Sequence, residues 1–185
     1  MPYWLIIVLV VIVVIILWVV STYNGFVSLK NKVEEAFSGM DIYLVKRYDL
    51  IPNLVNTVKG YAKHESETLE NVVAARNQAM NASGMEEKLE AEGELSKSLG
   101  RLMMLTENYP DLKANTNFMD LQNQLKTMET EIASSRKYYN GVVKAFNTKV
   151  EKIPSNIIAG IFGFKKQPLF VVQDEAQRQN VKVEF

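Results

Sequence analysis

The sequence contains no cysteine and a single histidine, His64. Without cysteine the chain cannot form a disulfide framework or a zinc site with thiolate ligands. One histidine leaves little for a catalytic relay centred on imidazole, or for a metal site that needs several such rings. His64 stands between Lys63 and Glu65 in a predicted helix, so we expect its side chain to face solvent.

The chain also lacks an excess of charge and the short motifs that mark common enzymes. Lys plus Arg number 21, and Asp plus Glu number 21. Because there is no basic excess to release counterions from a phosphate backbone, we expect no nucleic-acid partner. The sequence has no glycine-rich phosphate loop, no G-x-S-x-G motif and no kinase signature. We therefore expect no cofactor and no enzymatic activity.

Carboxylates are plentiful where the second predicted helix ends and the third begins. Such a run is usually a solvated face, and glutamates in a first helical turn also suit the helix dipole. The alternative is a weak divalent-cation site, because carboxylates on neighbouring helices can converge across a bundle. We assign no metal ligands among these residues, which are Glu65, Glu67, Glu70, Glu86, Glu87, Glu90, Glu92 and Glu94.

One long apolar run opens the sequence. Residues 4–20 read WLIIVLVVIVVIILWVV, without a polar or charged side chain. At about 1.5 Å per residue, a helix over this run and its flanks extends roughly 30 Å, which matches the hydrocarbon core of a bilayer. Aromatic residues stand near both ends, as in the interfacial belts of transmembrane helices: Tyr3, Trp4, Trp18 and Tyr23.

We predict an uncleaved transmembrane anchor over residues 1–22. A cleaved signal peptide is disfavoured, because no Lys or Arg precedes the run and no small-residue cleavage site follows it. Lys30 and Lys32 follow the run closely. This asymmetry favours the cytoplasmic side for the rest of the chain.

Four amphipathic segments follow the anchor, with apolar residues three or four positions apart. They cover about residues 23–48, 52–80, 86–107 and 112–152. The last has a heptad seam, which predicts supercoiled contact with partner helices: Phe118, Leu121, Leu125, Met128, Ile132, Ser135, Tyr139, Val142 and Phe146. Short connections make neighbouring helices antiparallel. The predicted fold is therefore all-α, with a single N-terminal transmembrane helix followed by an antiparallel, up-down-up-down four-helix bundle of long coiled-coil-like helices over residues 23–153.

A proline and several polar residues lie where the first helix of that bundle should end. We predict a corner over residues 47–52, with Asp49 capping the next helix and Pro52 in its first turn. Arg47, Asp49 and Asn53 form the best polar cluster in the sequence. An ion pair and cap at a helix corner account for it, and a ligand-binding or catalytic site is the alternative.

The segment that begins YNG occurs twice, at Tyr23 and at Tyr139. Spacing places the amides of each copy on one helical face. The two faces could meet and set the register between the first and fourth bundle helices, at some cost in stability. An amide-lined ligand slot and an exposed polar edge are the other interpretations of these residues, which are Asn24, Asn31, Asn140 and Asn147.

Residues 154–185 form a third region, with an apolar segment followed by a tail. Because four antiparallel helices return the chain to the level of the anchor, the apolar segment should lie near the membrane. It would then pack on the lipid surface as an amphipathic element with a basic edge, or alternatively close the open end of the bundle. Its residues are Ile157, Ile158, Ile161, Phe162, Phe164, Lys165 and Lys166.

Two blocks carry a resemblance to a known family: RYDLIPNLV at residues 47–55 and YPDLKAN at residues 109–115. With the N-terminal apolar run and NTKVEKIP, they resemble the LemA family of bacterial membrane proteins over nearly the whole chain. The resemblance implies a single-pass protein of the bacterial cell (inner) membrane with a helical bundle domain, and it implies no reaction.

We therefore expect an interaction or scaffolding module that binds membrane lipid and associates with copies of itself or with other envelope proteins. The alternative is an enzyme or ligand-binding protein whose site lies at Arg47, Asp49 and Asn53.

Overall fold

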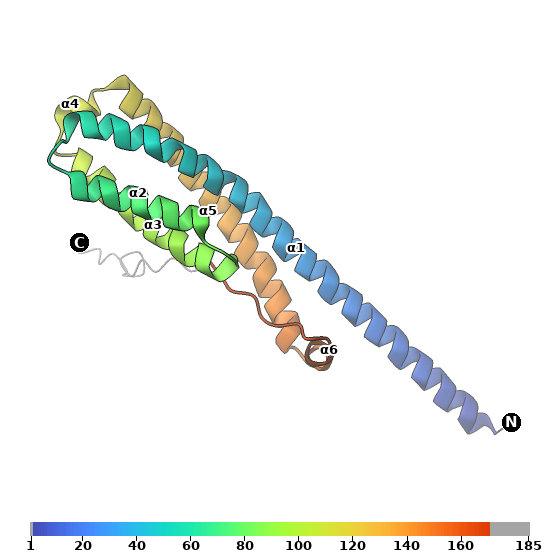
Figure 1. Cartoon of the computed structure of the whole chain (residues 1–185). Coiled ribbons are helices and arrows are strands. Elements are labelled where there is room, and N and C mark those ends of the chain that lie inside the picture. The colour runs from blue at the N-terminus through green and yellow to red at the C-terminus, as the bar shows by residue number, and fades with distance from the viewer. Residues whose placement is uncertain (1, 171–185) are drawn as a thin grey trace, which may run out of the picture. The chain divides into compact units, whose positions relative to one another are not determined.

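The computed structural model describes residues 2–170, and every regular element in that range is an α-helix (Figure 1). The all-α prediction is therefore confirmed, with one long apolar helix at the N-terminal end. The elements are α1 (Tyr3–Tyr61), α2 (Ser66–Asn81), α3 (Met85–Thr106), α4 (Pro110–Lys113), α5 (Thr116–Glu151) and α6 (Ser155–Phe162). The predicted tail beyond residue 170 lies outside the described residues.

Contacts group the described chain into two compact units. The anchor unit comprises residues 2–41 and 134–169, and the bundle unit comprises residues 42–133 with Phe170. Helices α1 and α5 contribute residues to both units. The predicted division at residues 22 and 153 stays a prediction.

Helix α1 continues through Pro52, so the predicted corner at residues 47–52 is wrong. A proline inside a helix lacks the N–H that would bind the carbonyl four residues earlier, here that of Tyr48. In the structure the guanidinium of Arg76, on α2, donates from Nε to the Tyr48 carbonyl oxygen at 2.8 Å. The donor that Pro52 cannot supply therefore comes from a neighbouring helix. Asp49 caps nothing, because it lies exposed inside α1.

The chain turns instead at residues 62–65. The Ala62 N–H still binds the Val58 carbonyl at 2.8 Å, and the Glu65 N–H then binds the Ala62 carbonyl at 3.2 Å. The next turn, at residues 82–84, falls between the predicted segments 52–80 and 86–107. Its Gly84 has φ +85°, a left-handed conformation that favours glycine.

Antiparallel helices enclose an apolar core in the bundle unit, and α2 packs directly against α3. Each helix contributes one buried stripe at the predicted spacing. Burial of each Val, Leu, Ile or Phe side chain in these stripes contributes roughly 1.5–3 kcal/mol. The stripes are Leu44, Ile51, Leu54 and Val58 on α1, Leu69, Val72 and Ala79 on α2, Leu89, Leu95, Leu99 and Leu102 on α3, and Phe118, Leu125 and Ile132 on α5.

Helix α5 begins four residues later than predicted. Asn115 is the reason, because its side-chain oxygen accepts the Phe118 N–H at 3.0 Å and caps a new helix after the short α4. Along α5 every second residue of the predicted seam is buried, so that buried seam residues recur every seven positions. The seam residues between them are half-buried. The buried ones are Phe118, Leu125, Ile132, Tyr139 and Phe146. The helix ends at Glu151, just before Pro154.

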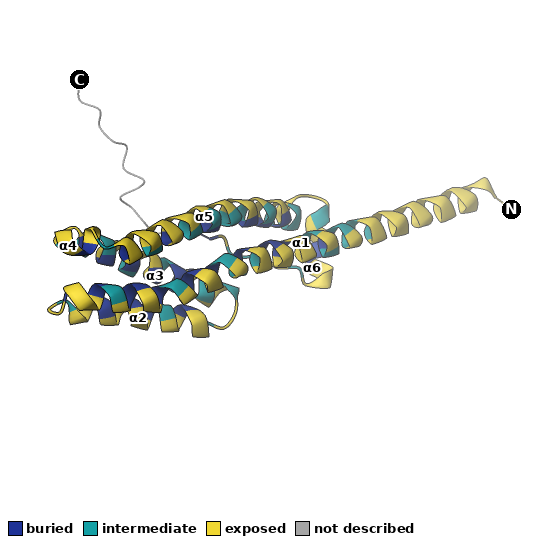
Figure 2. Cartoon of the chain, turned by 90° about the horizontal axis from the view of Figure 1, so that it is seen from above, coloured by how far each residue is buried: buried dark blue, intermediate teal, exposed yellow. Residues whose placement is uncertain are grey.

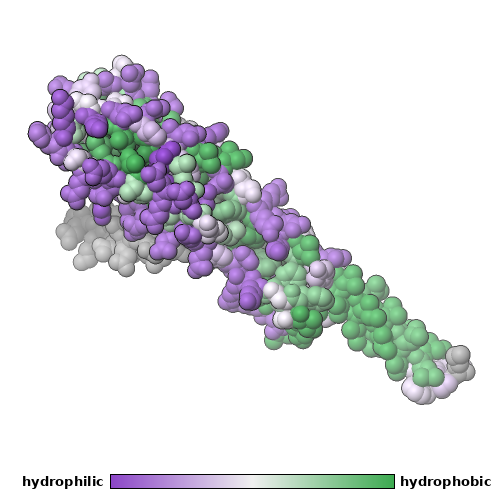
Figure 3. Space-filling model, viewed as in Figure 1, coloured by the Kyte–Doolittle hydropathy of each residue, from purple (hydrophilic) through white to green (hydrophobic). Residues whose placement is uncertain are grey.

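Within residues 2–170, no part of the chain covers the N-terminal part of α1. Large side chains from Leu5 to Val20 are about half exposed, and Figure 2 shows this stretch exposed along its length. Its surface is continuously hydrophobic in Figure 3. By length and composition, α1 is long and apolar enough to cross a membrane.

Candidate functional site

A buried polar network lies at the centre of the bundle unit. Arg47 comes from α1, Glu92 and Ser96 from α3, and Glu129 from α5. The Arg47 and Glu92 side chains are each 1% exposed, whereas that of Glu129 is 45% exposed. The network therefore begins in the core and ends at the surface.

The hydrogen bonds of the network centre on the guanidinium of Arg47. Arg47 Nη2 donates to Glu92 Oε2, and Nη1 donates to Glu129 Oε1 at 2.6 Å and to Ser96 Oγ at 3.1 Å. The second oxygen of Glu92 accepts the hydroxyl of Tyr48. Both Glu92 oxygens and both terminal nitrogens of Arg47 are thus occupied by protein groups. The third nitrogen of the guanidinium, Nε, is buried without a hydrogen-bond partner among the described residues. The two carboxylates compensate the buried positive charge of Arg47.

The sequence carries a signal for this network that the helix-corner interpretation missed. Arg47 sits in the apolar stripe of α1, three residues from Leu44 and four from Ile51. Glu92 occupies the equivalent place in α3, three residues from both Leu89 and Leu95. A charge at a core position in each of two helices, with opposite signs, indicates a buried ion pair.

The predicted polar cluster does not assemble. Asp49 and Asn53 are exposed and lie four residues apart on the outer face of α1, while Arg47 is buried. The three share a sequence neighbourhood but not a face, because a helix rotates about 100° per residue.

Other candidate ligands are also dispersed. His64 is exposed in the turn after α1. Among the described residues, no group of three His, Asp or Glu side chains is placed to hold a metal ion. Of the glutamates at the α2 and α3 ends, Glu92 is the buried one and serves the network described above.

The second block of the sequence resemblance lies at one end of the bundle unit. Tyr109 donates its hydroxyl to Glu65 Oε1 at 3.1 Å, and Asn115 Nδ2 donates to the Tyr61 hydroxyl at 2.9 Å. Desolvation, followed by the hydrogen bond and charge of Glu65, raises the pKa of Tyr109. Both contacts join the α4 region to the end of α1, so this block has a structural role.

The four amides that were predicted to set register lie in different surroundings. Asn24 and Asn31 are exposed, and Asn140 is half-buried. Asn147 instead binds the backbone of Gln167 twice: Nδ2 donates to the carbonyl oxygen at 2.9 Å, and Oδ1 accepts the N–H at 2.8 Å. This amide holds the extended segment after α6 against α5.

The anchor residues differ in their surroundings. Tyr3 and Trp4 are exposed at the start of α1, and Trp18 is 38% exposed. Tyr23 is half-buried and contacts the ring of Phe162 on α6, with centroids 4.7 Å apart.

Aromatic rings join α1, α5 and Phe164, the second residue after α6, in the anchor unit. Phe164 stacks on Phe26 with centroids 4.7 Å apart and meets Phe146 edge-on at 6.4 Å. Lys149 places Nζ 4.9 Å from the centroid of the Phe26 ring, and desolvation lowers the pKa of Lys149. A side chain at Gly25 would collide with the Lys149 ammonium.

Three of the open cavities along the described helices bear on the candidate sites. The cavity between α3 and α5 has a volume of about 560 Å³ and includes Ser96 and Glu129 of the buried network. One between α1 and α2 measures about 390 Å³ and includes Val55 and Leu69. The third, between α1 and α5 in the anchor unit, measures about 660 Å³ and includes Tyr138.

The LemA family model matches residues 36–185, which include the whole buried network, both sequence blocks and α6. The chain belongs to the LemA family. It is a helical protein, and its described residues include one candidate membrane-spanning helix.

Curated relatives of this LemA-family chain are distant in sequence. Magnetosome protein MamQ 2 of Paramagnetospirillum magneticum is 25% identical over 174 residues, which cover 80% of this chain and 64% of that protein. Magnetosome protein MamQ of Magnetospirillum gryphiswaldense has the same identity and coverage. Protein LemA of Metamycoplasma hominis is 24% identical over 137 residues, covering 74% and 63%. The chain spans less than two thirds of the length of the curated relatives it matches.

Proposed function

We propose that this LemA-family chain is a single-pass, membrane-anchored interaction module that self-associates and acts through its helical surfaces. The observation that carries the anchor is the uncovered apolar stretch of α1. Each large side chain from Leu5 to Val20 would gain roughly 1.5–3 kcal/mol on full transfer out of water, and no described part of the chain covers it. A lipid bilayer supplies the missing apolar surroundings.

The polar network supports an interaction role over a chemical one. Its charged groups bind one another, with Arg47 held between Glu92 and Glu129. A buried polar side chain can fix the register between packed helices. We propose that it specifies how α1, α3 and α5 meet, so that the module presents one defined surface.

For self-association we propose the open groove between α1 and α5 in the anchor unit. Its wall combines small residues, Gly141 and Ala145, with the exposed ring of Tyr138. Two copies anchored in the same bilayer with the same orientation would bring identical grooves to the same height, which raises their effective concentration. Small residues would let the two copies approach closely.

The test uses the full-length chain. We expect a detergent-solubilised mass above one chain over a wide range of protein concentrations. Because the sequence has no cysteine, an Ala145→Cys variant should cross-link to a dimer in native membranes, while Ser38→Cys, exposed outside the groove on α1, should not. A strictly monomeric particle at all concentrations, without cross-linking at residue 145, would contradict self-association.

The 560 Å³ cavity between α3 and α5 favours a second candidate function, the binding of a small carboxylate with an apolar body. Glu129, which lines this cavity and binds Arg47, could swing toward solvent and be replaced by the ligand's carboxylate. Leu99 and Met103 would contact the apolar part. This volume lies within the usual range for small-molecule sites.

A benzoate titration tests this candidate in the full-length chain, with the methyl resonance of Met103 as the readout. We expect the resonance to shift, and a Gly100→Leu variant, which fills the cavity, to abolish that shift. A side chain at Gly100 meets no atom within 4 Å of its Cβ, and the same holds at Gly93, where Gly93→Leu serves as the matched control. No response of Met103 at millimolar benzoate would exclude this candidate.

A further inference from the structure

Helix α6 has two different faces within the anchor unit. Ile158 and Ala159 are buried against the unit, whereas Ile157 and Ile161 are 56% and 69% exposed. Two exposed isoleucines four positions apart form an apolar stripe on the outer face of a helix. The inner face accounts for the folding of α6, and the outer stripe is left without a partner among the described residues.

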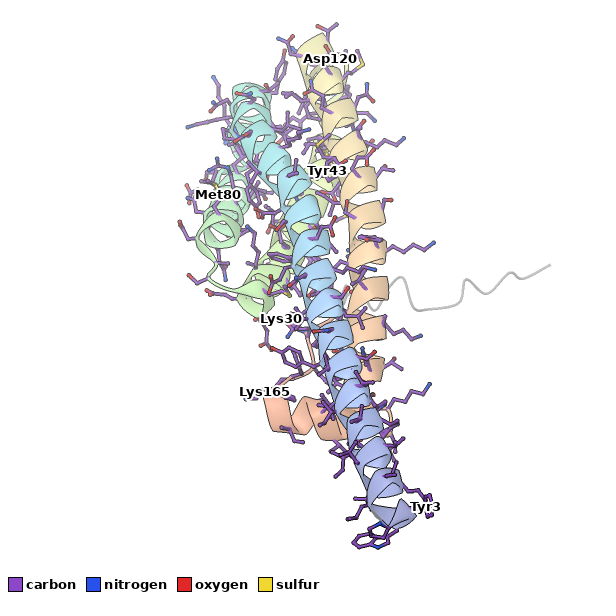
Figure 4. The ribbon with its side chains drawn as sticks, turned by 90° about the vertical axis from the view of Figure 1, so that its right-hand side faces the viewer. Tyr3, Lys30, Tyr43, Met80, Asp120 and Lys165 are labelled. Carbon is purple, nitrogen blue, oxygen red and sulfur yellow. The ribbon has the colours of Figure 1, made fainter. Side chains whose placement is uncertain are left out.

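The position of α6 is set by its aromatic neighbours. Phe162 contacts Tyr23, three residues beyond the end of the apolar run of α1. Gly163, with φ +72°, then turns the chain so that Phe164 stacks on Phe26. In Figure 4, α6 and the labelled Lys165 lie beside α1, between Lys30 and Tyr3 along that helix. The outer stripe is therefore at the level where α1 would leave the hydrocarbon core.

The charges around α6 have one dominant sign. From residue 149 to residue 166 the chain has four lysines and one acidic residue, Glu151, which gives a net charge of +3. Lys152 and Lys165 are exposed, and Lys166 pairs with Glu151. Apolar residues beside a basic edge are typical of segments that lie in the plane of an anionic lipid interface.

We propose that α6 lies on the surface of the bilayer that α1 crosses, with Ile157 and Ile161 among the upper acyl chains and the lysines beside anionic headgroups. This inference rests on the membrane anchor of the proposed function but not on self-association. We expect lipid to cover the outer stripe of α6, because the stripe continues the uncovered apolar surface of α1. With α6 as a second attachment, the anchor unit would have a defined tilt and rotation at the membrane.

The experiment places full-length protein in vesicles that carry quenching groups on the upper part of the acyl chain. A small environment-sensitive dye is attached to Gly160→Cys, an exposed position between the two isoleucines, against a background without native cysteine. Probes at Ser21→Cys and Lys137→Cys mark the end of the anchor and a distant exposed part of α5. We expect quenching at residue 160 close to that at residue 21 and several-fold above that at residue 137.

Charge substitutions distinguish membrane contact by α6 from insertion of the dye itself. With the dye at residue 160, the change Ile157→Glu with Ile161→Glu should reduce quenching to the level of the α5 probe. The matched change Ser28→Glu with Ser38→Glu, at exposed positions on α1, should not. Quenching that persists after the isoleucine changes would show that the dye and not α6 enters the membrane, and would overturn the inference.

The basic edge is tested by lipid composition. Vesicles with anionic lipid should give stronger quenching at residue 160 than zwitterionic vesicles, and Lys152→Gln with Lys165→Gln should remove the difference. Equal quenching in both lipids would overturn the headgroup contact. A probe at Val11→Cys, with quenchers deep in the acyl chain, distinguishes failure of the membrane anchor from failure of the α6 contact alone. If Val11 is not quenched, the anchor and this inference both fail; if Val11 is quenched and residue 160 is not, this inference alone fails.

Discussion

The hydrogen bond from Arg76 to the Tyr48 carbonyl makes a specific prediction about how α1 passes through Pro52. Replacing Arg76 by Met keeps the apolar stem of the side chain but removes the donor that the proline cannot supply. A carbonyl left without a partner in a buried site costs about 1–3 kcal/mol. Because Arg76 is half-buried, so that water reaches the site in part, we expect Arg76→Met to lower the free energy of unfolding by about 1–2 kcal/mol.

The same substitution should cost much less when residue 52 can donate. In a Pro52→Ala background the new N–H binds the Tyr48 carbonyl in the ordinary helical way, and the guanidinium is no longer required. There we expect Arg76→Met to cost at most about 0.5 kcal/mol, the range of ordinary surface changes. The coupling energy between positions 52 and 76 should therefore be about 1 kcal/mol.

The assay is urea unfolding of the full-length chain in a mild detergent, followed by far-ultraviolet circular dichroism, for the four combinations of residues 52 and 76. Arg101→Met, at an exposed position on α3, is the matched control and should change the free energy of unfolding little. Hydrogen exchange over residues 49–56 gives a local readout of the same carbonyl. An equal loss from Arg76→Met in both backgrounds would refute the compensation of Pro52 by Arg76.

Three further substitutions test the other contacts of the fold by the same unfolding assay. Arg47→Met should lower the free energy of unfolding by about 3–5 kcal/mol, because it leaves Glu92 buried without its ion-pair partner, whereas Glu129→Gln should cost about 1 kcal/mol or less; similar losses from the two changes would contradict this difference between the buried and the exposed ion pair. Burial raises the pKa of Tyr139 to about 12, so the stability that depends on its hydroxyl is complete below the ordinary pKa of 10 and is lost as pH rises toward 12. Tyr139→Phe should remove that part of the pH dependence. If the free energy of unfolding changes equally in the two chains from pH 9 to pH 12, this role of the Tyr139 hydroxyl is contradicted. Asn115→Ala should cost about 1 kcal/mol through loss of the α5 cap, with faster hydrogen exchange in the first turn of α5 as the local signature.

The long periodic elements were accessible from the sequence, because helix periodicity depends on residues three and four apart. The stripes of α1, α3 and α5 follow the predicted spacing of three or four residues, and the loop before α3 lies between the predicted segments 52–80 and 86–107. The start of α5 was misplaced because Asn115 was taken as a helix interior residue, whereas its side chain caps the helix. Local rules placed Pro52 in the first turn of a new helix for a similar reason, since they could not include a donor from another helix.

The candidate sites show the same limit. Arg47 was singled out from its neighbours in sequence, but its partners are 45 and 82 residues away on α3 and α5. The amide of Asn147 was expected to meet another helix and instead holds the backbone of Gln167, which no periodic pattern marks. Side chains that pair with a distant backbone leave no regular signal in the sequence.

By itself, the sequence determined the helical class, the long apolar stretch at the start of α1 and the stripes that face the core, because each follows from composition and from spacing within a single helix. The tertiary structure alone decided that α1 passes through Pro52, that Arg47 is buried between two carboxylates and that α6 lies beside Tyr23. These features depend on groups that meet only after the helices pack. The free energy of each contact depends on two residues far apart in the sequence, so the residues around either one do not predict it.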